Sequence, residues 1–228
     1  MRRKLAKAVC VAVLIPTLLN AQATTRKAPA TRAPVKSATT PPAAPPIRYV
    51  LAADGNEARY LVREELVGIG FPNDAVGKTS AISGAIVLDA NGGLVPAGSR
   101  ISVDVTTLKS DRANRDRYLK TAALETDKYP SVELAITALR GFPASLPATG
   151  QFSFELLGNL TVRALTRPVT WQVTATANHG ELSGTARTAM KFGDLGMPVP
   201  SAFVVMKLED NLRLEYDFHF VKDTTAKR

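Results

Sequence analysis

Alternation of apolar and polar side chains is the feature that most constrains how this chain can fold. Residues 212–220 read Leu-Arg-Leu-Glu-Tyr-Asp-Phe-His-Phe, so every second side chain is apolar. Shorter runs repeat the pattern at 101–105, 132–136, 152–156 and 169–173. Successive side chains of a β-strand point to opposite faces, so a period of two collects the apolar ones on one face. The sequence therefore predicts strands with one buried and one solvated face.

Turn signals that contain Gly, Asn or Pro separate these runs. They occur at residues 54–56, 91–93, 143–150, 178–180 and 193–200. About eight strands then fall within roughly 180 residues, a spacing typical of an antiparallel meander. Pro130 and Pro168 lack a backbone N–H, so we expect each to stand at the start of a strand, before residues 131–139 and 169–173.

Residues 111–124 break the alternation, because they contain no Gly or Pro and are rich in Arg, Ala and Leu. This composition predicts one short helix, capped by Ser110 or Asp111. We expect Arg115 to pair with neighbouring acidic side chains and Tyr118 and Leu119 to plug one end of a barrel. The alternative is that the arginines of this helix hold the head group of a ligand.

A sheet of about eight strands must bury its apolar face, either against a second sheet or by closing into a barrel, and the pattern of apolar residues fits both.

The first 23 residues have the composition of an export signal. Basic residues come first, residues 8–19 form an apolar run, and Ala21-Gln22-Ala23 offers the small residues that a signal peptidase requires. The apolar run of 12 residues is shorter than the about 20 that a membrane-spanning helix needs. We predict a signal peptide over residues 1–23, cleavage after Ala23, and a periplasmic or secreted mature protein. The only cysteine, Cys10, lies in the removed segment, so no disulfide is expected.

Residues 24–47 are rich in Pro, Ala and Thr and contain no acidic residue, which predicts a disordered linker before a domain at residues 48–224. Nine basic residues precede Asp54, the first acidic one, and account for the whole formal charge of +9. The rest of the chain is balanced, so it lacks the basic surface that a nucleic-acid partner requires. Two roles fit the basic linker: peripheral contact with an anionic membrane surface, or a simpler role as a soluble tether.

The sequence contains no recognisable pattern of catalytic or metal-ligating residues. The two histidines, His179 and His219, lack the close spacing typical of zinc sites, and we expect both to be solvated. No serine lies in a nucleophile elbow, and no glycine-rich loop matches a phosphate cradle. The sequence therefore predicts no catalytic residue, no metal site and no cofactor, and it favours a binding protein over an enzyme.

Two segments resemble the hallmarks of a known family. Residues 115–134, RDRYLKTAALETDKYPSVEL, are similar to an element in which Arg-Asp and a later Leu precede a Tyr-Pro that enters a strand. Residues 158–177, GNLTVRALTRPVTWQVTATA, are similar to its hairpin hallmark, with Arg163 and Ala164 replacing the usual His and Gly. On these residues the chain resembles the YceI-like, polyisoprenoid-binding family over about residues 49–222. The resemblance implies an exported, all-β protein: an antiparallel eight-stranded lipocalin-like barrel with one short helix between strands, and a polyisoprenoid in an apolar tunnel.

A tunnel for such a chain needs apolar walls, since a polyprenyl tail forms no hydrogen bonds and each buried CH₂ contributes about 0.8 kcal/mol. From the apolar strand faces we predict that seven side chains line it: Phe152, Phe154, Trp171, Val173, Tyr216, Phe218 and Phe220. The ligand would be a polyprenol, an isoprenoid quinone or another long apolar lipid. The alternative is a periplasmic structural or stress-response barrel whose interior these rings pack, with no ligand. The sequence is compatible with a monomer and with a homodimer.

Overall fold

The computed structural model describes residues 45–68, 71–201 and 205–225. The predicted signal peptide, its cleavage site after Ala23 and residues 24–44 of the predicted linker lie outside these described residues. Over the three described ranges, no helix is both long enough and apolar enough to cross a bilayer.

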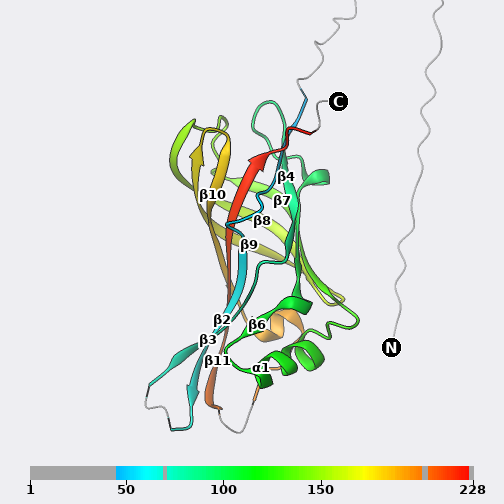
Figure 1. Ribbon diagram of the computed structural model, residues 1–228, viewed down its shortest axis with the longest axis vertical. Coiled ribbons are helices and arrows are strands. Elements are labelled where there is room, and N and C mark those ends of the chain that lie inside the picture. Colours follow the sequence, from blue (N-terminus) through cyan, green and yellow to red (C-terminus); the bar gives the residue numbers. More distant parts are fainter. Residues whose placement is uncertain (1–44, 69–70, 202–204, 226–228) are drawn as a thin grey trace, which may run out of the picture. The chain divides into compact units, whose positions relative to one another are not determined.

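Eight antiparallel strands form a closed ring (Figure 1). In ring order they are β1 (Ile47–Leu51), β4 (Ile82–Leu88), β5 (Arg100–Asp104), β7 (Ser131–Arg140), β8 (Thr149–Val162), β9 (Leu165–Asn178), β10 (Glu181–Met190) and β11 (Val205–Lys222). The ring closes because β1 pairs with β4 on one side and with the end of β11 on the other, where Leu51 lies opposite Phe220. The predicted eight-stranded antiparallel fold is confirmed, and closure rather than a second sheet buries the apolar face.

Three further strands extend the sheet beside β11. They are β2 (Glu57–Leu66), β3 (Asn73–Thr79) and β6 (Lys109–Ser110). β11 pairs with β2 along its first part and with β1 along its last part, and the predicted turn at residues 54–56 separates β1 from β2. At this break the Asn56 side chain donates to the Ala52 carbonyl at 2.9 Å and accepts from the His219 N–H at 3.0 Å. These bonds satisfy backbone groups that the interrupted ladder leaves free.

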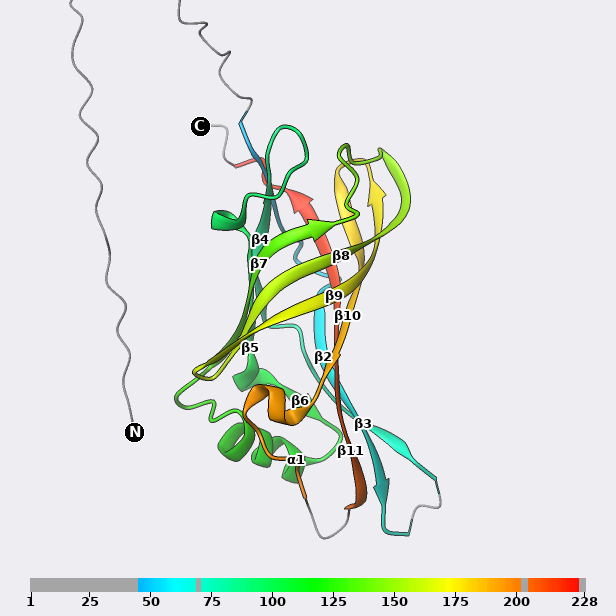
Figure 2. The ribbon, with the colours of Figure 1, turned by 180° about the vertical axis from the view of Figure 1, so that it is seen from behind.

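Helical turns gather at one end of the barrel (Figure 2). They are α1 (Ala113–Tyr118), the π-helical turn η3 (Leu119–Ala123) and the 3₁₀ turn η4 (Phe192–Leu195), while the 3₁₀ turns η1 (Pro96–Gly98) and η2 (Val105–Thr107) flank β5. The helix predicted within residues 111–124 is confirmed, but its predicted cap is wrong. Arg112 precedes the first helical residue. Ser110 instead belongs to β6, and its hydroxyl donates to the Asp116 carboxylate at 2.6 Å.

Pro130 immediately precedes β7, as predicted, whereas the prediction for Pro168 was wrong. Pro168 lies inside β9, opposite Asn159 of β8. β9 begins earlier than expected because residues 163–164 form the tight turn of the β8–β9 hairpin, with Arg163 at a φ of 54°. β10 pairs with β9 only from Gln172 onward, so the missing N–H of Pro168 leaves no bond to β10 unmade.

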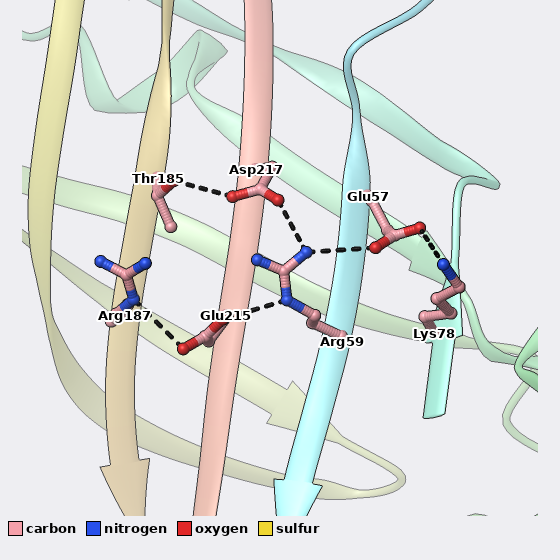
Figure 3. Close-up of polar contacts among 7 residues, drawn as sticks. All are labelled: Glu57, Arg59, Lys78, Thr185, Arg187, Glu215 and Asp217. Atoms are coloured by element: carbon pink, nitrogen blue, oxygen red, sulfur yellow. Dashed lines mark hydrogen bonds and ion pairs between the residues drawn. The ribbon is translucent and has the colours of Figure 1, made fainter. Parts of the chain in front are cut away.

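A ladder of polar and charged side chains crosses the outer faces of β3, β2, β11 and β10 (Figure 3). Its members are Lys78, Glu57, Arg59, Glu215, Asp217, Arg187 and Thr185. Arg59 is central, since its guanidinium donates to Asp217 at 2.6 Å, Glu215 at 3.0 Å and Glu57 at 3.1 Å. These bonds, that to Asp217 foremost, raise the pKa of Arg59 above its ordinary value. Cross-strand pairs of this kind fix the register in which β2 joins the barrel.

Candidate ligand-binding cavity

The apolar faces of the ring strands enclose a cavity of about 730 Å³. Sites for small molecules typically measure about 300–1,000 Å³, so the space is large enough for a sizeable ligand. All seven side chains predicted as tunnel lining contribute to its wall: Phe152 and Phe154 from β8, Trp171 and Val173 from β9, and Tyr216, Phe218 and Phe220 from β11. The fold thus brings the predicted residues of three strands, β8, β9 and β11, to the wall of one cavity. Their contact with a ligand stays a prediction.

Part of the wall is a cluster of phenylalanine rings. Phe152 and Phe154 stack with ring centroids 5.9 Å apart, and Phe142 meets both edge-on, at 5.8 and 4.9 Å. Sequence reasoning missed Phe142, because it follows β7 in a loop and belongs to no alternating run. All three rings also border the cavity. They therefore line the empty space without filling it.

The helical end of the barrel supplies another part of the wall. Tyr118 and Leu119 pack against a buried apolar cluster there, as expected of side chains that plug the barrel. Phe192 and Leu195 of η4 belong to this cluster and also line the cavity, and so does Met197. Leu195 and Met197 lie in the turn predicted at residues 193–200 and Phe192 immediately precedes it, so none of the three was predicted as lining. Their signal was the spacing of Phe192 and Leu195, since residues three apart share one face of a 3₁₀ turn.

One buried ion pair interrupts the apolar wall. Arg115 of α1 reaches Glu64 of β2, with 2.7 Å between the guanidinium and carboxylate, and the Glu64 side chain is only 3% exposed. Arg115 also pairs with Asp111 inside the helical segment, in agreement with the expectation that opposite charges of this segment pair with one another. A buried carboxylate needs such a counter-charge because desolvation of a lone ion is costly. The pair therefore leaves the cavity without net charge at this point.

Two further polar groups of the wall, those of Tyr216 and Trp171, carry no charge. Burial raises the pKa of Tyr216 above its ordinary value, so the phenol stays protonated, and it donates to the Asn56 side chain at 3.3 Å. The indole N–H of Trp171 is buried and has no hydrogen-bond partner among the described residues. An unpaired buried donor costs about 1–3 kcal/mol. A wall of this kind suits an uncharged, mostly apolar molecule.

The cavity opens toward solvent at its helical end. Six of its lining residues are exposed, and all come from α1, the residues around it or the segment after η4: Arg112, Ala113, Asn114, Ala122, Pro198 and Ser201. At the opposite end the lining residues are buried or half-buried, among them Tyr49 and Phe220. The mouth of the cavity therefore lies beside the helical turns.

The histidines lie outside this cavity. His179 occupies the β9–β10 turn with a φ of 46°. The ring of His219 faces outward among charged neighbours and is partly exposed, and it lies between two carboxylates, 3.5 Å from Asp54 and 3.4 Å from Glu181. In the part of the chain that the structure describes, no three His, Cys, Asp or Glu side chains gather into a group that could hold a metal.

The sequence is similar to a known protein family and to curated proteins of two Pseudomonas species. A family model described as the YceI-like domain matches residues 49–220. A UPF0312 protein of Pseudomonas putida (strain GB-1) is 33% identical over 116 residues, which cover 47% of this chain and 57% of that protein. A UPF0312 protein of Pseudomonas fluorescens (strain SBW25) is 31% identical over 121 residues, 48% of this chain and 59% of that protein. The chain thus matches less than two thirds of the length of these curated relatives.

Solved structures share the fold at low sequence identity. A polyisoprenoid binding domain from Saccharophagus degradans, implicated in plant cell wall breakdown, superposes with a TM-score of 0.58 at 9% identity, covering 77% of this chain and 98% of that one. BcnA from Burkholderia cenocepacia gives 0.52 at 13% identity, over 72% of this chain and 95% of that one. The YCEI protein of Campylobacter jejuni gives 0.52 at 12% identity, over 65% and 84%. These likenesses confirm the predicted lipocalin-like barrel.

Proposed function

Because the chain belongs to the YceI-like domain family, we propose that it is a binding protein that holds a polyisoprenoid or another long apolar lipid inside its barrel. The observation that carries this proposal is the cavity of about 730 Å³ with an apolar, aromatic-rich wall. A polyprenol and an isoprenoid quinone both offer a long tail that such a wall accommodates. Each CH₂ group that leaves water contributes about 0.8 kcal/mol, so a long tail binds without any specific polar contact.

The alternative, a structural or stress-response barrel with a packed interior, is less well supported. Protein interiors are packed like organic crystals and contain few voids larger than a water molecule. In a purely structural barrel, a cavity of about 730 Å³ would only lower stability. It leaves side chains such as Phe154 and Trp171 without protein neighbours on one side, so their dispersion contacts there are lost. The empty volume therefore favours binding over packing.

Binding rather than catalysis is the activity that this wall supports. The lining residues include two carboxylates, and both are held by arginines: Glu64 by Arg115 at 2.7 Å and Glu215 by Arg59 at 3.0 Å, so neither is free to act as an acid or base. The polyisoprenoid binding domain from Saccharophagus degradans shares the fold, which lends the lipid class support by likeness. The signal peptide predicted over residues 1–23 would place the mature protein in the periplasm or outside the cell.

Fluorescence of Trp171 tests the proposal directly. This is the only tryptophan of the chain, and it lies in the cavity wall. Addition of solanesol from detergent micelles should change the intensity and the wavelength of its emission, with saturation at one ligand per chain. A water-soluble short prenol serves as the control, because it buries too few CH₂ groups to bind tightly. Emission that stays the same with solanesol and with an isoprenoid quinone would contradict the proposal.

A further inference from the structure

Exposed apolar side chains collect at the helical end of the barrel. Five large apolar side chains of the described residues are strongly exposed, and four of them lie at this end: Val67 (62%), Phe71 (70%), Val199 (42%) and Met206 (70%). The fifth, Ile47 (40%), begins β1, which pairs with the last residues of β11 at the other end. Soluble proteins seldom gather exposed apolar side chains at one place unless another surface covers them.

We call these four exposed side chains the apolar rim. Val67 and Phe71 belong to the turn between β2 and β3, and Met206 lies in β11 where this strand begins, opposite the end of β2. Val199 stands between Pro198 and Pro200, which both line the cavity. Figures 1 and 2 show the end of β2, the start of β3 and the start of β11 reaching past the helices at the same end. Three of the four rim residues lie within two residues of side chains that line the cavity, namely Leu66, Pro198, Pro200 and Leu208, so the apolar rim borders the cavity at its helical end.

Charges around the apolar rim balance. Residues 63–74, 111–120 and 206–213 carry seven basic and seven acidic side chains. A surface without net charge gains little by approaching a nucleic acid or a strongly charged protein. Such a surface is not repelled electrostatically by a zwitterionic surface, which also has no net charge. The attraction at this end therefore comes from apolar side chains.

The geometry points to the apolar rim as a membrane-docking edge, through which an apolar ligand passes between a phospholipid bilayer and the cavity. This inference rests on the proposed function, since a long isoprenoid dissolves in bilayers and hardly in water. Apolar side chains of peripheral proteins enter the headgroup and acyl boundary by about 5–10 Å, a depth that suits single turns and strand ends. The four side chains expose on the order of a few hundred Å², less than the about 800 Å² per partner that a stable dimer buries.

A local reporter tests docking without interference from the basic N-terminal segment. In full-length protein carrying Trp171→Phe, we would introduce Phe71→Trp at the apolar rim or, as the matched control, Ile47→Trp at the opposite end. Vesicles of phosphatidylcholine with brominated acyl chains quench only tryptophans that enter the bilayer. The Phe71→Trp protein should lose most of its emission, at low and at high salt alike. The Ile47→Trp protein should keep its emission.

Two results would overturn the inference: no quenching at Phe71→Trp, or equal quenching at both positions. Self-association is a third contrary outcome, and sedimentation would reveal it as a dimer without lipid that Phe71→Asp dissociates. The failure of the proposed function is a separate observation. If Trp171 of the otherwise unchanged chain responds to solanesol from micelles while Phe71→Trp is not quenched, the ligand site stands and the docking edge fails. If Trp171 never responds while Phe71→Trp is quenched, docking stands and the proposed ligand fails.

Discussion

The guanidinium of Arg115 lies 2.7 Å from the carboxylate of Glu64, so one ion pair ties helix α1 to strand β2 at the wall of the cavity. Glu64 is almost completely buried, whereas Arg115 retains some exposure toward the mouth. The pair is part of the barrel's own structure, because each partner neutralises the other. Arg115 therefore holds the helical end in place and is not free for a ligand head group.

Removal of Arg115 should destabilise the protein while leaving ligand choice unchanged. Arg115→Met strands the Glu64 carboxylate in an apolar site, and loss of one partner of a buried pair typically costs about 3–5 kcal/mol. Urea unfolding measures this loss. Addition of Glu64→Gln to Arg115→Met should recover most of it. Arg117→Met is the matched control, since the side chain of Arg117 is exposed and, among the described residues, bonds only Asn114 of the same helix. Unchanged stability with loss of bound lipid would instead assign Arg115 to the ligand.

Filling the cavity should block the ligand without unfolding the barrel. Ala186 of β10 is buried and borders the cavity, so Ala186→Phe places a ring in space that is now empty. We expect the Trp171 response to solanesol to be lost and the melting temperature to stay the same or rise. Ala189→Phe adds the same ring to an exposed position of the same strand and should leave both unchanged. Equal ligand response in both variants would argue against this cavity as the site.

The outer ladder should make stability depend on pH. Burial acts to raise the pKa of Asp217, but hydrogen bonds from Arg59 and Thr185 outweigh it and hold the pKa below its ordinary value of 3.8. A carboxyl group whose pKa is lower in the folded state stabilises the fold above its unfolded pKa, and this contribution is lost as the pH falls through the lowered value. The unfolding free energy of the native chain should exceed that of Asp217→Asn at pH 7, and the difference should shrink below a pH of about 4. A difference that stays constant across this range would contradict the assignment.

Close approach of two strands makes one glycine of β10 irreplaceable. A Cβ added to Gly184 would lie 2.1 Å from the Thr174 carbonyl oxygen and 2.9 Å from the Cα of Ala175. Since these are backbone atoms of β9, the strands would have to separate, and we expect Gly184→Ala to cost about 2 kcal/mol or more in urea unfolding. Gly193→Ala is the control, because no atom of the described residues lies within 4 Å of its added Cβ. Similar stability of the two variants would count against the strand spacing described.

Local period was enough to predict five of the eight ring strands, β5, β7, β8, β9 and β11, and the inward faces that carry the seven residues predicted as lining. On β11, for example, the period of two already assigns Tyr216, Phe218 and Phe220 to one face, and closure of the ring turns that face inward. The start of β9 was harder, because Pro168 normally marks a strand end. β9 tolerates Pro168 in its interior because β10 does not pair with β9 at that position, and this is a property of the assembled sheet.

Contacts between distant segments could not be predicted from the sequence. The Arg115–Glu64 pair joins side chains 51 residues apart, and nothing near Glu64 in the chain shows that its face of β2 meets a helix. Phe142 likewise reaches the wall from a loop, where no periodicity specifies its direction. Both depend on how the barrel closes, so they follow from tertiary structure and not from local pattern.

Native mass spectrometry of the protein purified from its own cells tests the central claim most directly. The account predicts a stoichiometric adduct that is released by solvent and fragments in a series of isoprene units. Ala186→Phe, prepared in the same way, should carry less of it. A protein that is isolated without an adduct and takes up neither added polyprenol nor added isoprenoid quinone would contradict the account and would leave the barrel as a fold without the proposed ligand.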